Sequence, residues 1–83
     1  MYQVVVPKHV LKELEKIDKP NQRLIYTKMR DLEKGYFSKD KLLKGKHKGK
    51  YRKRCGQYRI VYLKENNILL ITIVRVAHRK EVY

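Results

Sequence analysis

Hydrophobic and polar positions follow different periods along the chain, and each change of period marks a predicted element. The stretch YQVVV, residues 2–6, is rich in β-branched side chains and predicts a short strand that Pro7 ends. The apolar residues that follow have the spacing of one face of an amphipathic helix: Val10, Leu11, Leu14 and Ile17. A break at residues 18–20 separates this helix from a second one, predicted over about residues 20–34 and ended by Gly35. The short break predicts an antiparallel helical hairpin.

The second half of the chain alternates with a period of two, as strands do. YRKRC, residues 51–55, and YRIVYL, residues 58–63, flank the dipeptide Gly56-Gln57, which predicts a β-hairpin with a two-residue turn. ILLITIVRV, residues 68–76, predicts a third strand after a second turn. This last stretch is apolar on both of its faces, which predicts an interior position in the sheet.

The segment between the helices and the hairpin, residues 36–49, is polar and basic. It is interpreted as a loop with an apolar anchor at Leu42 and Leu43. The predicted fold class is therefore α+β, in one domain of residues 1–83 with the order β-αα-βββ. The apolar faces cover each other when the helical hairpin packs on one face of a small antiparallel sheet.

The two-residue turn fixes which hairpin residues oppose each other, and directly opposed residues share a face. One face carries the residues expected to meet the helices: Tyr51, Cys55, Tyr58, Ile60 and Tyr62. The other face carries four cations: Lys50, Arg52, Arg54 and Arg59. Like charges directly opposed destabilise a sheet. The pairing of Arg54 with Arg59 therefore predicts either an anion bound between them or two side chains turned into water.

The distribution of charge points to a partner. The chain has 22 Lys and Arg against 8 Asp and Glu, a formal net charge of +14, and residues 41–64 hold ten Lys and Arg but no acidic residue. This uneven distribution predicts a polyanionic partner such as nucleic acid, and the alternative is a surface suited to solubility or heat tolerance. The cations expected to contact the phosphates of such a partner are Lys44, Lys46, Lys48 and Arg54.

Several classes of site and location are excluded by what the sequence lacks. The single cysteine, Cys55, cannot form an internal disulfide and is interpreted as a buried structural thiol of a cytoplasmic protein. The N-terminus has no signal-peptide pattern, and the longest hydrophobic stretch, residues 68–74, is too short to span a bilayer. Ser38 is the only serine, which excludes a serine–histidine–acid site.

The three histidines, His9, His47 and His78, lie far apart in sequence, and no acidic residue has metal-ligand spacing with them. We expect surface histidines, no metal and no cofactor. The alternative is that His47 and His78 act as an acid–base pair on RNA.

Arginines and lysines together have the chemistry that RNA cleavage needs. Arginine stabilises a dianionic phosphoryl-transfer transition state well but is a poor base. A lysine surrounded by Arg52, Arg54 and Arg59 loses its proton more readily, because neighbouring cations favour the neutral amine. A tyrosine can exchange a proton or stack on an RNA base.

The stretches YRKRCGQYRIVY and IVRVAHRKEVY strongly resemble the RelE side of the RelE/ParE toxin superfamily, in which a YR-x-R-x-G-x-YR hairpin precedes a strand that ends in HR..VY. The resemblance covers essentially the whole chain. It implies a ribosome-dependent mRNA endoribonuclease that cuts codons in the decoding site by attack of the 2′-hydroxyl, without a metal. It also implies inhibition of translation and neutralisation by an antitoxin.

Matched position by position, the resemblance implies five catalytic residues. Arg59 and Arg79 are assigned to the scissile phosphate. Lys50 is assigned to the base, and Arg52 to the base or to charge support. Tyr83 is assigned to stacking and orientation of the nucleotide, and either Lys50 or Tyr83 carries the proton. Arg52 stands where some relatives have lysine, and we expect no C-terminal helix of the kind that some relatives have.

The expected partners are the ribosome with its mRNA and rRNA, and a RelB-like antitoxin whose acidic, amphipathic segment covers the basic face. No membrane partner is expected. One alternative is the ParE branch, which shares the fold, inhibits DNA gyrase and tends to lack the residues supplied here by Arg59, Arg79 and Tyr83. The other alternative is a non-catalytic RNA-binding module.

Overall fold

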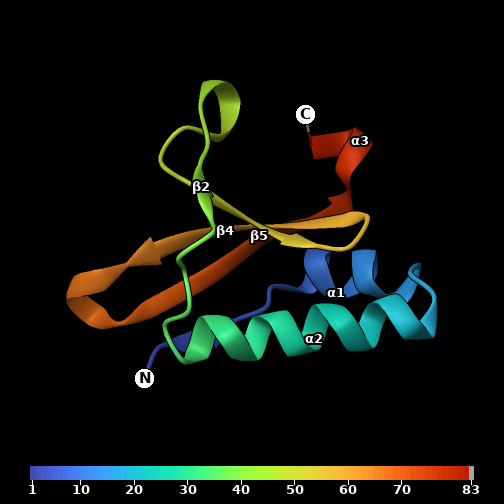
Figure 1. Ribbon diagram of the computed structural model, residues 1–83, viewed down its shortest axis with the longest axis horizontal. Helices are drawn as coiled ribbons and strands as arrows, with labels where there is room; N and C mark the ends of the chain where they lie inside the picture. Colours follow the sequence, from blue (N-terminus) through green and yellow to red (C-terminus); the bar gives the residue numbers. More distant parts are fainter. Residues whose placement is uncertain (83) are drawn as a thin grey trace.

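The chain folds as a five-stranded sheet with helices α1 and α2 on one face and the short helix α3 on the other (Figure 1). The computed structural model describes residues 1–82, except for the side chain of His47. In chain order the elements are β1 (Gln3–Val5), α1 (Lys8–Glu15), α2 (Lys19–Glu33), β2 (Lys41–Leu42), a 3₁₀ turn (Gly45–His47), β3 (Tyr51–Cys55), β4 (Tyr58–Glu65), a second 3₁₀ turn (Asn66–Ile68), β5 (Leu70–His78) and α3 (Arg79–Val82). The strand order across the sheet is β1-β5-β4-β3-β2.

This architecture confirms the predicted α+β class with a helical hairpin on one face of the sheet. β5 is interior, between β1 and β4, as its two apolar faces predict. Three details differ from the prediction. β1 pairs with β5 in parallel, β2 lies inside the segment interpreted as a loop, and α3 forms a single helical turn after the last strand, where the sequence predicts no helix.

The register of the β3–β4 hairpin is the one predicted from its turn. Cys55 lies opposite Tyr58, and Arg54 lies opposite Arg59. Gly56 has a φ of 62°, the positive value that the first position of a type II′ hairpin turn requires. The face assignment of the hairpin follows from this register.

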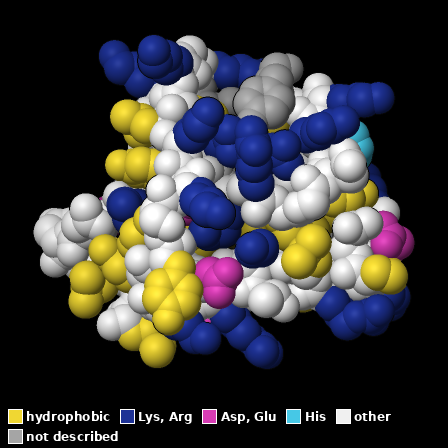
Figure 2. All heavy atoms as spheres, viewed as in Figure 1, with side chains coloured by type: hydrophobic (Ala, Val, Ile, Leu, Met, Phe, Trp, Pro, Cys, Tyr) yellow, Lys and Arg dark blue, Asp and Glu magenta, His cyan; other side chains and the backbone are white. Residues whose placement is uncertain are grey.

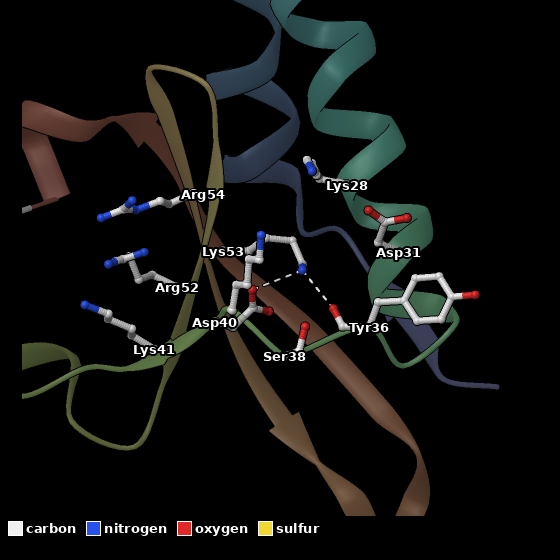
Figure 3. Close-up of a pocket in the computed structure, with 10 residues that line it drawn as sticks. Lys28, Asp31, Tyr36, Ser38, Asp40, Lys41, Arg52, Lys53 and Arg54 are labelled. Carbon is white, nitrogen blue, oxygen red and sulfur yellow. Dashed lines mark hydrogen bonds and ion pairs between the residues drawn. The ribbon is translucent and has the colours of Figure 1, made fainter.

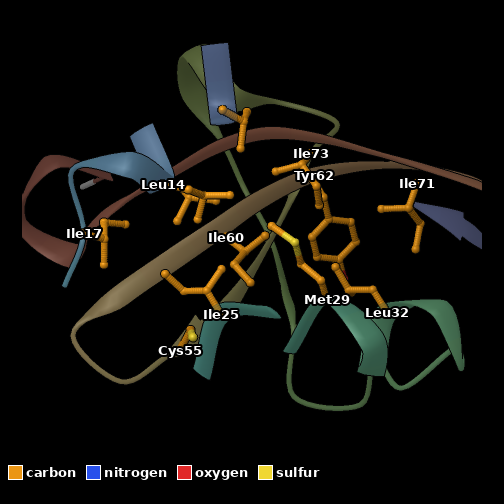
Figure 4. Close-up of a cluster of buried hydrophobic side chains, with 12 residues drawn as sticks. Leu14, Ile17, Ile25, Met29, Leu32, Cys55, Ile60, Tyr62, Ile71 and Ile73 are labelled. Carbon is orange, nitrogen blue, oxygen red and sulfur yellow. The ribbon is translucent and has the colours of Figure 1, made fainter. Parts of the chain in front are cut away.

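The main core lies between the two long helices and the sheet (Figure 4). Ile25, Met29 and Leu32 of α2 have helical spacing and all point into it. The strands contribute Ile60, Tyr62, Ile71 and Ile73. Cys55 is only 1 % exposed in this core, which confirms the prediction of a buried thiol, and burial raises the pKa of that thiol to about 11.

A β-bulge between β4 and β5 changes the direction of the β5 side chains. Val61 lies opposite Arg75 and Tyr62 lies opposite Ile73, which leaves Val74 as an extra residue in β5. Residues on both sides of the bulge therefore pack in the main core: Ile73 and Val76. A smaller apolar cluster forms on the other face of the sheet and consists of Val61, Val74, Ala77 and Val82 with Leu43.

Side chains of α1 cover the edge of β5 that β1 leaves open, because β1 pairs only with residues Leu70 to Thr72. His9 Nε2 lies 2.7 Å from the carbonyl oxygen of Val74. Glu13 Oε1 accepts a hydrogen bond of 3.0 Å from the backbone N–H of Val76. α1 thus satisfies backbone groups that a sixth strand would otherwise bond.

Candidate nucleic-acid interface

The predicted cationic residues lie on the face of the sheet opposite α1 and α2, here called the outer face. Figure 1 shows α3 and the loop between β2 and β3 on this side of the sheet. From the same direction, Figure 2 shows many Lys and Arg side chains gathered over this part of the molecule. The outer face is therefore a cationic surface supported by the small apolar cluster beneath α3.

Arg54 and Arg59 face each other across β3 and β4, but their environments differ. Arg54 is exposed, whereas Arg59 is only 6 % exposed. Arg59 Nη1 donates to the carbonyl oxygens of Gly56, at 2.9 Å, and Tyr58, at 2.8 Å. Its Nε is buried and has no hydrogen-bond partner among residues 1–82. Arg59 is thus folded against the hairpin turn, so the alternative of two arginines turned into water is wrong for this side chain.

Arg52 lies at the centre of the outer face, opposite Val61 on β4 and Lys41 on β2. Only 4 % of Arg52 is exposed, so most of this charged side chain is buried by its neighbours on the sheet. Figure 3 shows Lys41, Arg52 and Arg54 pointing to the same side of β3. The alternation predicted for the hairpin therefore places Arg52 and Arg54 in one row, and β2, which the sequence did not predict, adds Lys41 to it.

The lysines before the hairpin are arranged differently. The backbone N–H of Leu43 donates to the carbonyl oxygen of Lys50 at 2.8 Å and closes a loop of residues 43–50. The exposed lysines of this loop are Lys44, Lys46 and Lys48, and Lys50 is half-buried at its end. Because residues Gly45–His47 form a 3₁₀ turn, the spacing of two does not place these lysines on one face of a strand.

The first residue of α3 meets the hairpin turn. The backbone N–H of Arg79 donates to the carbonyl oxygen of Gln57 at 2.8 Å. Arg59 binds the carbonyl of the neighbouring residue, Gly56, so the structure brings Arg59 and Arg79 to the same turn. Val82 anchors α3 by packing in the outer-face cluster. The remaining predicted catalytic residue, Tyr83, lies outside the described residues.

A buried polar network on the opposite side of β3 was missed by the sequence analysis. Lys53 Nζ donates to Asp40 Oδ1 at 3.0 Å and to the carbonyl oxygen of Tyr36 at 2.8 Å. Tyr62 donates its hydroxyl proton to the second oxygen of Asp40. Burial, followed by the hydrogen bond to Asp40, raises the pKa of Tyr62. Lys53 lies opposite Ile60, so the predicted register already placed it on the helix face.

The histidines that the structure describes do not form a metal site. His9 Nε2 makes a hydrogen bond with the Val74 carbonyl oxygen at the edge of β5. The His78 ring contacts the Tyr58 ring edge-on, with 5.7 Å between centroids. Within residues 1–82, no three His, Cys, Asp or Glu side chains lie close enough to hold a metal ion. The helices of this part of the chain also include none that is long and apolar enough to cross a membrane.

The fold and the outer face together define a small α+β domain with an arginine-rich sheet face. A family model described as "ParE toxin of type II toxin-antitoxin system, parDE" matches residues 4–83. The chain belongs to this toxin family, which confirms the resemblance to the RelE/ParE superfamily. A search of curated protein sequences gave no match.

Solved structures share the fold over nearly the whole chain. One is the toxin–antitoxin complex RelBE2 from Mycobacterium tuberculosis, with 24 % identity, a TM-score of 0.84, and 94 % of this chain and 98 % of that chain covered. The archaeal RelE–RelB complex from Pyrococcus horikoshii has 27 % identity and a TM-score of 0.81, with 94 % of each chain covered. The isolated E. coli RelE toxin has 23 % identity and a TM-score of 0.74, with 100 % of this chain and 92 % of that chain covered.

Proposed function

We propose that this chain is a cytoplasmic, ribosome-dependent mRNA endoribonuclease that inhibits translation. The observation that carries the proposal is the environment of Arg59. Its guanidinium group is buried and fixed to the hairpin turn, and its Nε is free of hydrogen bonds to any described residue. The backbone of Arg59 lies opposite that of Arg54 in the hairpin. A fixed arginine fork beside a second cation suits a phosphate whose negative charge increases in the transition state.

In the proposed reaction the 2′-oxygen of the RNA forms a bond to phosphorus while the bond from phosphorus to the 5′-oxygen breaks. Arg59 and Arg79 bind the phosphate. Lys50 or Tyr83 takes the proton from the 2′-hydroxyl, and a proton is delivered to the leaving oxygen. Arg52 supports the charge from the centre of the outer face. The exposed cations that hold the surrounding RNA are Lys44, Lys46, Lys48 and Arg54.

The proposed neutralising partner is a RelB-like antitoxin with an acidic, amphipathic segment. The net charge of +14 favours such a partner, because charge complementarity speeds association and selects against basic proteins. The similar structures from M. tuberculosis and P. horikoshii are, by their descriptions, complexes of toxin and antitoxin.

The test is mRNA cleavage on programmed ribosomes, mapped by primer extension, with wild-type protein, Arg59→Ala and Arg23→Ala. Arg23 is an exposed arginine of α2, away from the outer face, so its variant is a matched control for lost charge. Loss of one fixed donor to the transition state lowers the rate by about a hundredfold or more, so cuts are expected with Arg23→Ala and not with Arg59→Ala. Cuts that persist in Arg59→Ala, or that need no ribosome, contradict the proposal. Ribosome binding without cuts in any variant favours a non-catalytic RNA-binding module.

A second candidate function is inhibition of DNA gyrase. The family model that matches residues 4–83 carries the ParE description, and this observation favours the candidate. A supercoiling assay with purified gyrase distinguishes the two functions. If one equivalent of the protein inhibits gyrase and no codon-phased cleavage is found, the protein is a gyrase inhibitor and not an endoribonuclease.

A further inference from the structure

A β-bulge turns Arg75 of β5 toward the outer face of the sheet. Regular pairing would place Val74 opposite Val61 of β4, but the bulge places Arg75 there instead. Val61 also lies opposite Arg52 of β3, and directly opposed residues share a face of a sheet. Arg75, Val61 and Arg52 therefore form one row across the outer face, and Arg75 lies on the strand that both α1 and α3 contact.

The guanidinium group of Arg75 is held by these two helices. Nη2 donates to Glu81 Oε2 of α3 at 3.1 Å, and Nη1 donates to the carbonyl oxygen of Glu81 at 3.3 Å. Nε donates to Glu13 Oε2 of α1 at 3.3 Å. All three nitrogen atoms therefore have acceptors, and two carboxylates compensate the single charge. Arg75 thus differs from Arg59, whose buried Nε has no partner among residues 1–82, and it is poorly suited to bind a phosphate itself.

α3 needs such contacts because it is a single helical turn. Its four residues are too few to form a stable helix alone, since forming the first turn of a helix is unfavourable. The Arg79 N–H is bonded to the Gln57 carbonyl oxygen, and Val82 packs in the outer-face cluster. Between these two points, Arg75 binds both the side chain and the backbone of Glu81. The turn is therefore fixed at three places.

We propose that Arg75 is a positioning residue that holds α3 so that Arg79 can bind the scissile phosphate. The role of Arg79 at the phosphate rests on the proposed function. Arg79 is exposed and forms no ion pair with any residue of the part described, so the backbone of α3 decides where its side chain lies. A displacement of about 1 Å in a binding group lowers a reaction rate by about a hundredfold. Loss of the Arg75 contacts is therefore expected to slow cleavage, although no group that touches the RNA is removed.

The alternative is that Arg75 only stabilises the fold. The side chains of Arg75 and Glu81 are 32 % and 61 % exposed, and ion pairs this exposed contribute little to global stability. A small surface element can also open without unfolding the whole domain. A positioning role therefore lowers the cleavage rate while the urea midpoint and the ribosome affinity stay near wild type. A purely stabilising role lowers the urea midpoint and leaves cleavage by the folded protein unchanged.

The first test measures single-turnover mRNA cleavage on programmed ribosomes at saturating protein. Arg75→Gln and Glu81→Gln remove the same ion pair from its two ends, and a third protein carries both changes. Each single variant is expected to cut about tenfold or more slowly than wild type. The double variant is expected to cut no more slowly than the slower single variant, because the same contact is lost. Arg23→Gln removes a positive charge from an exposed position of α2 and is the control, expected to cut at the wild-type rate.

Hydrogen exchange supplies a second measurement that needs neither ribosomes nor cleavage. The Arg79 amide is expected to exchange faster in Arg75→Gln than in wild type, because α3 opens more often. The Leu43 amide, which donates to the carbonyl oxygen of Lys50, is the control and is expected to keep its wild-type rate. An unchanged Arg79 amide overturns the proposal. A loss of cleavage matched by an equal loss of ribosome affinity, or explained by global unfolding, also overturns it.

The two measurements separate this proposal from the endoribonuclease proposal. If wild-type protein gives no cuts, the endoribonuclease proposal fails, and the Arg79 amide alone decides whether Arg75 holds α3. If wild type, Arg75→Gln and Glu81→Gln all cut at the same rate, the positioning role is overturned and the endoribonuclease proposal stands.

Discussion

Asp40 and Lys53 form an ion pair of 3.0 Å in which the two side chains are only 3 % and 10 % exposed. The pair joins the segment before β2 to the middle of β3, and the hydrogen bond from Tyr62 adds β4 to the same network. Asp40 directly precedes β2, from which the basic loop of residues 43–50 begins. This buried network therefore holds the base of the loop that carries the exposed lysines.

Replacing Asp40 by alanine is expected to destabilise the protein strongly. The change leaves the ammonium group of Lys53 buried without its counter-charge, and removing one partner of a buried pair costs about 3–5 kcal/mol. Urea unfolding followed by circular dichroism measures the free energy. Asp31→Ala is the control, because Asp31 lines the same pocket as Asp40 (Figure 3) but forms no ion pair within residues 1–82, and its loss is expected to cost less than about 1 kcal/mol. Equal losses for the two variants would falsify the role assigned to the network.

Cys55 gives the stability a dependence on alkaline pH. Burial raises the pKa of its thiol from 9.0 in the unfolded chain to about 11 in the fold, so the folded state disfavours the thiolate. The stabilisation from the neutral thiol is complete below pH 9, and it is lost as the pH rises from 9 toward 11. The shift corresponds to about 2–3 kcal/mol. Urea unfolding with a reductant is expected to show wild type losing about that much more stability than Cys55→Ala between about pH 8 and pH 11. Parallel pH profiles for the two proteins would contradict the assignment.

Glu13 has two roles that two substitutions can separate. One carboxylate oxygen accepts from the Val76 N–H, and the other lies 3.3 Å from Arg75 Nε. Glu13→Gln keeps an acceptor for the amide and loses only a partly exposed ion pair, so a cost of about 0–1 kcal/mol is expected. Glu13→Ala also leaves a strand-edge N–H without its partner, and a cost of about 1–3 kcal/mol is expected. Thermal unfolding measures both, and faster exchange of the Val76 amide is expected in Glu13→Ala alone.

The loop lysines are expected to set the salt dependence of RNA binding. Each phosphate contact to single-stranded RNA contributes about 0.7 to the slope of log affinity against log salt concentration. Changing Lys44, Lys46 and Lys48 together to alanine is therefore expected to reduce the slope by about 2. Fluorescence anisotropy with a labelled RNA at several salt concentrations gives the slope. A control with alanine at Lys8, Lys12 and Lys34 removes the same charge from exposed positions on or next to the helices. Similar slopes for both triple variants would show that only net charge matters.

The sequence predicted the hairpin well because its signals are local. The turn dipeptide Gly56-Gln57 fixed the register, and the register fixed which side chains share a face. The register also showed that Arg54 opposes Arg59, and this pair of arginines is the basis of the proposed function. The position of Arg79 beside this turn depends instead on the backbone bond to Gln57, a long-range contact that neither period nor composition reveals.

The parts that the sequence analysis missed depend on contacts between distant segments. In the sequence, Asp40 is only the last acidic residue before a basic stretch. Its ion pair with Lys53 depends on the fold, because it forms only where the segment before β2 packs against the sheet. β2 has only two residues, too few for any period to show. The extra residue at Val74 is visible only against β4, because a bulge is a mismatch between two strands and not a property of one.

The direct opposition of Arg54 and Arg59 in the hairpin predicts that the heat resistance of this chain depends on the anions around it. An anion held between the two guanidinium groups binds the folded state, because the unfolded chain does not keep the two arginines together. By mass action, such an anion raises the free energy of unfolding by an amount that grows with its concentration. The chain is therefore expected to melt at a higher temperature in phosphate than in chloride of equal ionic strength. By the same argument, a polyanion that binds at these two arginines also stabilises the fold.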